Sequence, residues 1–399
     1  MKSNYEPLGK HIRLVDYRNS EEVTSTVLGI SIDKEFMPSV ANVIGTDLSR
    51  YKLISKGLFA CNPMHVGRDE RLPIALYEKD NAAIVSPAYF MFEIIDRDVL
   101  NEEYLMMWFR RPEFDRECWF MTDGSVRGGI TWDDLCRIQL PVPPYERQLD
   151  VVESYRAITR RIAMKKEIND NLAKTIKAVF KSWFLDFDAF DGVELVQSQY
   201  GLIPNGWHYE LLGNLCDCVT KGTTPTTLGK DFTDTGINFI KGESINDDHS
   251  FNKTLFAHID DETDELLKRS RIYVNDIVFT IAGTLGKFAL VDSSAIPANT
   301  NQAVAIIRTS KIMPAMLYSY FIGEWQVEFY KRNTQQAVQA NLSLGTIKDL
   351  PILLPDSKGQ DHYMQLVTPL IVGMQNNFSE IERLYELQNQ LLARLSSSR

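Results

Sequence analysis

The stretch that decides the fold runs from Gln148 to Trp183 and reads QLDVVESYRAITRRIAMKKEINDNLAKTIKAVFKSW. It contains neither proline nor glycine, and Pro143 and Pro144 stand just before it, where a helix can begin but cannot extend backwards. Large or apolar residues recur every three or four positions, so they form one stripe along one side of a helix. The stripe comprises Val151, Tyr155, Ile158, Ile162, the polar Lys165 and Asn169, then Leu172, Ile176, Val179 and Trp183. At about 1.5 Å per residue this helix would be roughly 55 Å long.

The C-terminus repeats the pattern. Its stripe comprises Met364, Val367, Ile371, Met374, Phe378, Ile381, Tyr385, Gln388, Leu392 and Leu395. Two stripes of matched length, far apart in the sequence, favour an antiparallel coiled-coil pair within one chain. Two amphipathic helices buried in separate cores are the other interpretation.

Two residues interrupt the second stretch. Pro369 removes a helix hydrogen bond, so we expect a kink there, or a helix start with Thr368 as N-cap. Gly373 weakens the helix by about 1 kcal/mol relative to alanine.

Length and composition bound the class of protein. The chain has 399 residues, of which 44% are hydrophobic, enough for two or three globular domains. No apolar run approaches the 18 or so residues of a membrane span, and the N-terminus lacks the apolar core of a signal peptide. Five cysteines are an odd number at low density, which is typical of free thiols in a reducing compartment. We therefore expect a cytoplasmic protein.

The net charge of −10, taken alone, argues against a nucleic-acid partner. The local field matters more than the sum, and the basic residues are clustered. These clusters are Arg110–Arg111, Arg160–Arg161, Lys165–Lys166, Lys268–Arg271 and Lys331–Arg332.

The two halves of the chain align with each other. Tyr5–Gly9 matches Tyr209–Gly213, and Lys56–Arg68 runs without gaps against Asn275–Lys287. An offset of about 212 then holds for some forty residues, pairing Phe109 with Phe321, Ile130 with Leu342, Leu135 with Ile347 and Pro143 with Pro355. Each half ends in its long helix, so the pattern indicates a tandem duplication.

Each half reads as mixed α and β. Short β-type runs punctuated by Gly, Asn and Asp occur at 238–240, 277–280 and 303–307, and helices are expected at 102–110 and 314–331. The fold class is thus α+β, with two tandem mixed domains joined by two long helices. The expected boundaries are 1–145 for the first domain, 146–185 for the first helix, 186–206 for a linker, 207–356 for the second domain and 357–399 for the second helix.

Three fragments look catalytic but are incomplete. Asn62–His65 lacks the second proline and the aromatic residue of an amino-methyltransferase loop, and no Gly-rich cofactor turn precedes it. Gly283–Lys287 has the wrong spacing for a phosphate loop, and Phe288 follows where Ser or Thr is needed. Pro355–Lys358 resembles a nuclease motif but lacks the separate acidic-x-Lys pair. We therefore expect a reader or adaptor with no catalytic residues and no metal site.

The ordered motifs of the second half resemble the specificity subunit of type I restriction-modification systems, and the resemblance covers nearly all of the chain. The motifs are Ile203–Trp207 with Leu212–Gly213, Lys221–Pro225, Phe239–Gly242, Gly283–Lys287, Asn301–Gln302, and Gln335–Asn341 leading into Ile347–Pro355. The first half departs from the pattern, because it lacks the Pro-x-Gly-Trp opening and the Thr-Thr-Pro loop. Divergent halves are what reading two different half-sites would require.

The resemblance implies two target-recognition domains, related by a pseudo-two-fold axis, that read a bipartite double-stranded DNA target across a helical spacer. It also implies partners, namely two methyltransferase (modification) subunits and restriction/translocase subunits. S-adenosylmethionine, ATP and Mg would be held by those partners, and this chain would hold no cofactor. The basic outward face of the helix pair, with Arg160, Arg161, Lys165 and Lys166, is a candidate docking surface, and a solvated face is the alternative.

Base reading requires forked donors, amides and small groups on loops that a rigid scaffold aims. The candidates in the first half are His65, Arg68, Arg71, Tyr89, Ser125 and Arg127. Those in the second half are Thr223, Thr224, Lys241, Ser244, Thr284, Lys287, Gln302, Gln339 and Asn341. For each of them the plain alternative is a solvated loop residue or a turn former. For the whole chain the alternative is a coiled-coil adaptor that does not bind nucleic acid.

Overall fold

The computed structural model describes residues 5–39, 45–64, 66–122, 128–190, 192–327, 329 and 341–395. The chain divides into two compact units. Unit 1 comprises Met1–Ile162 with Arg383–Arg399, and unit 2 comprises Ala163–Glu382. Within the described part of the chain, no helix is long and apolar enough to cross a membrane.

Unit 1 contains two four-stranded sheets. One has the order β2-β9-β6-β7 and the other β4-β3-β8-β5, while β1 pairs with β10. The strands are β1 (Tyr5–Pro7), β2 (Ile12–Leu14), β3 (Val27–Ile30), β4 (Phe36–Pro38), β5 (Lys52–Ile54), β6 (Phe59–Cys61), β7 (Ile74–Leu76), β8 (Ala83–Val85), β9 (Phe90–Ile94) and β10 (Gln139–Pro141). The short helices are α1 (Val66–Asp69), α2 (Glu102–Phe109), α3 (Pro112–Phe120) and α4 (Trp132–Arg137). The helix predicted at 102–110 is therefore confirmed as α2.

Unit 2 repeats the four-stranded first sheet, while its second sheet has three strands where that of unit 1 has four. Its first sheet has the order β14-β20-β17-β18, and its second the order β16-β15-β19, with β15 and β19 parallel. The strands are β11 (Leu195–Ser198), β12 (Gly201–Pro204), β13 (His208–Leu211), β14 (Cys216–Lys221), β15 (Ile237–Ile240), β16 (Ala257–Ile259), β17 (Ile277–Thr280), β18 (Phe288–Leu290), β19 (Ala298–Thr300), β20 (Val304–Thr309) and β21 (Pro351–Leu354). The helices are α6 (Leu212–Leu215), α7 (Asp261–Leu266), α8 (Pro314–Ile322) and α10 (Leu344–Lys348).

The duplication predicted from the sequence is visible in matched contacts. Strand β1 pairs with β10 in unit 1, as β13 pairs with β21 in unit 2. A Cβ added at Gly9 would lie 2.8 Å from Cys136 Cβ, and one added at Gly213 would lie 2.9 Å from Lys348 Cβ. Both glycines thus allow the same close approach, to α4 in one unit and to α10 in the other. The tandem α+β fold is confirmed.

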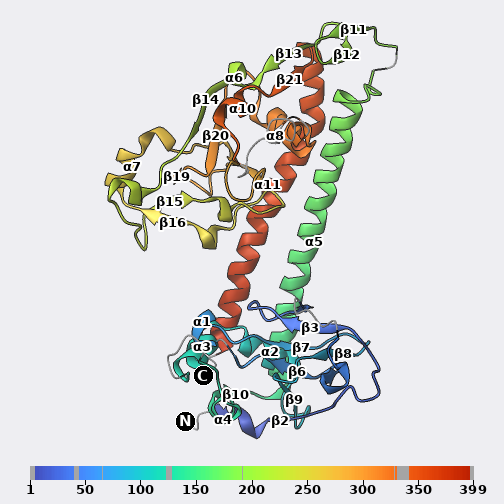
Figure 1. Ribbon diagram of the computed structural model, residues 1–399, viewed down its shortest axis with the longest axis vertical. Coiled ribbons are helices and arrows are strands. Elements are labelled where there is room, and N and C mark those ends of the chain that lie inside the picture. The colour runs from blue at the N-terminus through green and yellow to red at the C-terminus, as the bar shows by residue number, and fades with distance from the viewer. Residues whose placement is uncertain are drawn as a thin grey trace. The chain divides into compact units, whose positions relative to one another are not determined.

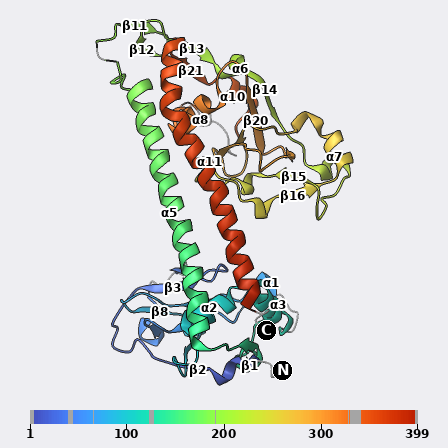
Figure 2. The same cartoon turned by 180° about the vertical axis from the view of Figure 1, so that it is seen from behind.

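The two long helices are α5 (Tyr145–Phe184) and α11 (Ser357–Arg394), and both contribute residues to each unit. In unit 2 they lie side by side, as Figures 1 and 2 show from opposite directions. Lys165 Nζ lies 2.8 Å from Glu380 Oε2, and the Cβ position of Gly373 lies 3.5 Å from Leu172 Cδ1. The contacting residues have rising numbers along α5 and falling numbers along α11, so the pair is antiparallel, as predicted.

Polar side chains mark the middle of the pair. Asn377 donates through Nδ2 to Asn169 Oδ1 at 2.7 Å, and it accepts from Lys165 Nζ at 2.9 Å. In unit 1, Gln388 donates to Thr159 Oγ1 at 2.7 Å. The buried Asn169–Asn377 pair favours one register over others, because any slip leaves a buried amide without a partner. The polar positions that interrupt the predicted stripe therefore specify the register.

The second stripe needs two corrections. Tyr385 is 43% exposed, whereas Leu384 is 8% exposed, so Leu384 and not Tyr385 belongs to the buried stripe. Helix α11 begins at Ser357 and runs through Pro369, so the proline is not its start. Val367 and Ile371 on either side of it are fully buried, and this packing holds the helix together across the missing hydrogen bond.

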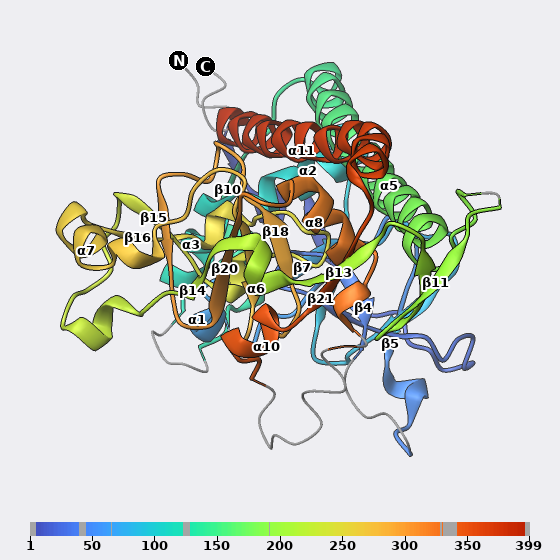
Figure 3. The ribbon, with the colours of Figure 1, turned by 90° about the horizontal axis from the view of Figure 1, so that it is seen from above.

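Aromatic packing fastens α5 to the core of unit 2. Phe184 lies against Tyr320 and Tyr363, each with a ring-centroid distance of 4.8 Å, and Phe180 lies 4.9 Å from Tyr320. Helix α8 carries Tyr320 and packs beside β18, as Figure 3 shows. α8 ends at Ile322, and residues 325–327 and 329 are helical again, so the helix predicted at 314–331 is interrupted at 323–324; residues 328, 330 and 331 lie outside the described residues. A Cβ at Gly323 would meet the Phe180 ring at 2.2 Å.

Candidate nucleic-acid interface

Several loops of unit 2 meet at one end of its first sheet. Strand β14 ends at Lys221 opposite Ala305, near the start of β20, and β17 ends at Thr280 opposite Val304. The loops after β14 and β17, and the one before β20, therefore lie at the same edge. Leu342 donates its backbone N–H to Ile281 O at 2.9 Å, which brings the segment at 341–342 to that edge as well.

The second sheet delivers another loop to this edge. Strands β15 and β19 are parallel, with Ile240 opposite Thr300, so the residues after both strands emerge together. Thr300 Oγ1 donates to Ile240 O at 2.7 Å, and Gly222 N donates to Asn301 O at 3.0 Å. The loops that begin at Gly222, Lys241, Ile281 and Asn301 thus converge, and we call this surface the loop edge of unit 2.

The structure places the predicted residues of the second half as follows. Thr223 and Thr224 are half-buried in the loop after β14, and Gln302, Thr284 and Asn341 are exposed in the other loops. Gln339 lies outside the described residues. These five described residues, with Lys241 and Lys287, belong to one surface although they span more than a hundred positions of sequence. Their convergence is what a recognition surface built from loops on a rigid sheet requires.

Ser244 is different from the other candidates. Its side chain is fully buried and donates to Leu255 O at 3.2 Å. It therefore holds the loop after β15 in place and does not present its hydroxyl to solvent.

The lysines of the loop edge are partly neutralised. Lys287 Nζ lies 2.9 Å from Asp247 Oδ1, and Lys241 Nζ lies 4.6 Å from the centre of the Phe232 ring and 3.9 Å from Glu243. Lys221, which the sequence reasoning missed, is exposed and forms no ion pair with any described residue. Its position at the end of a strand that leads into a Gly-Thr-Thr-Pro loop was the available signal. Lys241 and Lys287 can exchange their acidic partners for a phosphate, and Lys221 can bind one directly.

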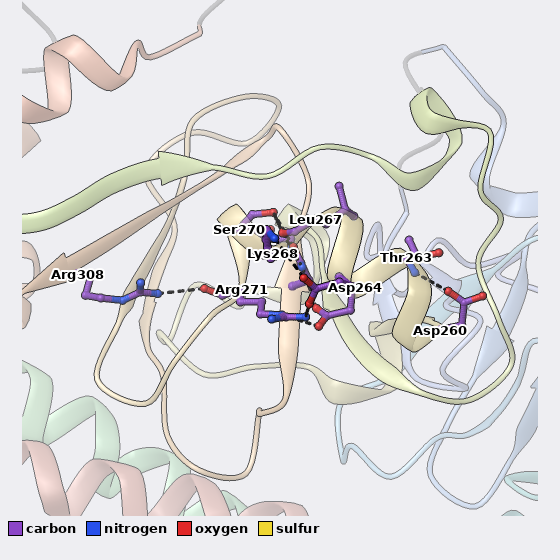
Figure 4. A network of polar contacts seen from close by, with 11 residues as sticks. Asp260, Thr263, Asp264, Leu267, Lys268, Ser270, Arg271 and Arg308 are labelled. Atoms are coloured by element: carbon purple, nitrogen blue, oxygen red, sulfur yellow. Dashed lines mark hydrogen bonds and ion pairs between the residues drawn. The ribbon is translucent and has the colours of Figure 1, made fainter.

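A polar network lies beside the end of β19, and Figure 4 shows the part of it around Asp264, Ser270 and Arg271. Asn299 accepts from Ser270 Oγ at 2.7 Å and from Thr300 N at 2.9 Å, and it donates to Asp264 Oδ1 at 3.0 Å. Arg271 Nε donates to Asp264 Oδ2 at 2.6 Å. Every polar atom of the Asn299 amide is satisfied, so the end of β19 is held rigidly. The sequence reasoning missed this network, because its members lie about thirty residues apart.

Arg308 extends the network towards β17. It forms a two-bonded pair with Asp276, with distances of 2.8 and 2.7 Å, and it also donates to Arg271 O at 3.0 Å. The Asp276 hydrogen bond raises the pKa of Arg308. Because its guanidinium is engaged by Asp276 and by a backbone carbonyl, Arg308 serves the scaffold.

In unit 1 the equivalent edge is formed by the loop between β6 and β7 and the residues before β9. Cys61 lies opposite both Ile74 and Phe90, and Ile130 N donates to Pro63 O at 3.1 Å. The bond from Ile130 N to Pro63 O corresponds to the bond from Leu342 N to Ile281 O in unit 2, and Leu342 is the repeat partner of Ile130. We call this surface the loop edge of unit 1.

Three predicted residues of the first half are described. Arg68 is exposed and pairs with Asp69 at 2.6 Å, and Arg71 lies 3.3 Å from Asp33. Tyr89 is half-buried against the core of the second sheet, and this burial raises its pKa. His65, Ser125 and Arg127 lie outside the described residues. Arg68 on α1 and Arg71 both lie in the connection between β6 and β7, and Tyr89 directly precedes β9 at the same edge.

Residues 204–382 match the family model described as the type I restriction modification DNA specificity domain. The second half of the chain therefore resembles a type I DNA specificity domain, and the relatives that match most of the chain are specificity subunits. It is 23% identical over 308 residues to the type I restriction enzyme MjaIX specificity subunit of Methanocaldococcus jannaschii, covering 76% of this chain and 70% of that one. It is likewise 23% identical over 332 residues to the HindI specificity subunit of Haemophilus influenzae, covering 67% of this chain and 70% of that one.

A solved structure shares the fold. The type I restriction-modification S subunit from M. genitalium aligns over 99% of this chain and 96% of its own length, with a TM-score of 0.53 and 14% sequence identity. The tandem arrangement of two mixed domains and two long helices is therefore a fold that this chain shares with a solved protein.

Proposed function

We propose that this chain reads a bipartite DNA target, with one half-site for each unit. The observation that carries the proposal is the repeated loop edge. Both units present loops at the same end of a sheet with the same strand order, yet the residues on those loops differ. Two copies of one scaffold with unlike loops are suited to reading two unlike short sequences.

We further propose that α5 and α11 set the number of unread bases between the half-sites. Both helices contribute to each unit, and the asparagine pair specifies one register between them. A fixed register gives a fixed length of paired helix. The gap in the target would then follow the helix length and not the sequence of the loops.

Two methyltransferase subunits, with restriction and translocase subunits, are the proposed partners in the cytoplasm. They would hold S-adenosylmethionine, ATP and Mg, and the target adenine would be flipped into a methyltransferase subunit. This chain would supply recognition and assembly without catalysis. Arg160 and Arg161 are exposed on α5 and suit a docking surface, but Lys165 is engaged with Asn377 and Glu380 and does not belong to that face.

The competing function is a coiled-coil adaptor that does not bind nucleic acid. The net charge of −10 is the observation that favours it. The family match gives it no support. Salt dependence separates the two, since binding that neutralises phosphates weakens steeply as salt rises.

The decisive experiment maps methylated adenines in the genome of the host. We expect one bipartite motif to be methylated in the wild type, to be lost when this gene is deleted, and to return when the gene is restored. The modification gene stays intact in all three strains. If deletion removes no methylated motif, the proposed function is wrong.

A further inference from the structure

Thr224 and Gln302 are joined across the loop edge of unit 2. Thr224 Oγ1 donates to Gln302 Oε1 at 2.5 Å, although the residues are 78 positions apart. Thr224 stands at the N-cap of the 3₁₀ turn Pro225–Leu228, yet its hydroxyl does not cap that turn. The hydroxyl is therefore used to orient the glutamine.

The backbones that carry the two residues are locked together. Gly222 N donates to Asn301 O, and Asn301 Oδ1 accepts from Ala303 N at 3.0 Å. Thr227 Oγ1 donates to Thr224 O at 2.7 Å. Below them, Asn299 and Thr300 are buried in the network described above. Gln302 thus presents an exposed amide from a rigid backbone, and the Thr224 side chain holds that amide in place.

The hydrogen bond fixes which way the amide faces. With Oε1 accepting from Thr224, the Nε2 group has no hydrogen-bond partner among the described residues, and Oε1 keeps a second lone pair. A donor beside an acceptor, both held in one plane, matches the acceptor N7 and the donor N6 that adenine presents in the major groove. Guanine presents two acceptors there, and cytosine a donor alone.

We propose that Gln302, oriented by Thr224, reads an adenine in the half-site bound by unit 2. This inference rests on the proposed function. Gln302 is the specificity residue and Thr224 is its positioning residue. The adenine that is read need not be the adenine that is methylated.

The test uses the complete complex of this chain with its methyltransferase subunits, and selection from duplexes with randomised half-sites. Gln302→Ala should reduce discrimination for adenine at one position of one half-site by about 10- to 100-fold. Gln302→Glu turns the donor into an acceptor, and the preference at that position should shift towards cytosine, which offers a donor there.

Two variants test the positioning role. Thr224→Val removes the hydroxyl and should relax the preference at the same position as Gln302→Ala, whereas Thr224→Ser retains the hydroxyl and should restore it. Gln197→Glu is the matched control, since Gln197 is an exposed glutamine on β11, away from the loops. It should leave the motif unchanged. In every variant the half-site bound by unit 1 should persist, which shows that the complex is folded.

The possible contrary results are distinct. An unchanged motif with Gln302→Ala would overturn the inference. A uniform loss of affinity, without a change of preference, would overturn it too, because it would mark Gln302 as a phosphate contact. If the wild-type complex selects no motif at all, the proposed function itself fails.

Discussion

Replacing Gly222 with alanine should abolish recognition of one half-site while the other is still read. A Cβ at this position would lie 1.7 Å from Thr300 O and 2.9 Å from Asn301 N, and both are backbone atoms that cannot rotate away. The loop after β14 and the loop before β20 would be forced apart, and the Thr224–Gln302 contact would be lost with them. We expect the affinity of the complex for its target to fall by about 100-fold or more, roughly 2.7 kcal/mol or more.

Gly242→Ala is the matched control for this prediction. Gly242 lies at the same loop edge, but its added Cβ would meet only Thr280 Cγ2, at 3.5 Å, which is an ordinary contact. Binding by this variant should be close to wild type. Circular dichroism should show that both variants are folded. Full affinity in a folded Gly222→Ala variant would mean that the loop edge does not contact DNA.

Lys34→Met should destabilise unit 1 by about 3–5 kcal/mol. Lys34 is 4% exposed, and its Nζ donates to Asp115 Oδ1 at 2.7 Å and to Phe109 O at the end of α2. Asp115 also accepts from Leu72 N at 3.0 Å, so the pair joins the β3–β4 hairpin, α2, α3 and the loop before β7. Removing the lysine leaves a carboxylate buried without its cation. Native-state hydrogen exchange of β6 and α2 measures the loss, and the amides of β17 and α8 in unit 2 are the internal reference.

Lys56→Met is the control, because the Lys56–Asp80 pair has exposed side chains and should contribute nothing measurable. Lys34→Met/Asp115→Asn should recover part of the stability, since it removes the buried charge and keeps an acceptor for Leu72.

Burial lowers the pKa of Lys34 below 10.5, and the Asp115 carboxylate opposes the shift. The unfolded chain then binds more protons in the alkaline range, so wild-type stability should rise with pH towards 10.5. The Lys34→Met variant should lack this rise, and a change in stability no larger than that of Lys56→Met would contradict the account.

The sequence predicted the long helices because their signal is local and repeated. Ile162, Ile176 and Trp183 of the first stripe are buried, and the other stripe positions of α5 are at least half-buried. The disruption of the helix by Pro369 was overestimated, because burial along the whole stripe offsets the local penalty of about 3 kcal/mol. Tyr385 was wrongly assigned to the stripe because, over many turns, the buried positions of α11 drift away from a strict three-four spacing.

The site was less predictable than the fold. The repeat and the resemblance located the loops, and the structure brings Thr224 and Gln302 into contact. Ser244 has a polar side chain in the correct loop, yet only the tertiary structure shows that it is buried. Asn299 and Asp264 could not be found from sequence, because their bonds depend on how β19 packs against α7. Residues that support a site through long-range contacts leave no local pattern.

The gap between the half-sites should widen when the two long helices are lengthened. Four residues would be inserted after Ala163 in α5 and four after Glu382 in α11, between the contacts of Lys165 with Glu380 and of Thr159 with Gln388. Four-residue insertions are tolerated in coiled coils and add about 6 Å, on the order of one to two base pairs. The control places four residues in the turn between β11 and β12. The account predicts, by selection from duplexes with randomised gaps, the same two half-sites with a longer gap for the helix variant alone. An unchanged gap in that variant would contradict it.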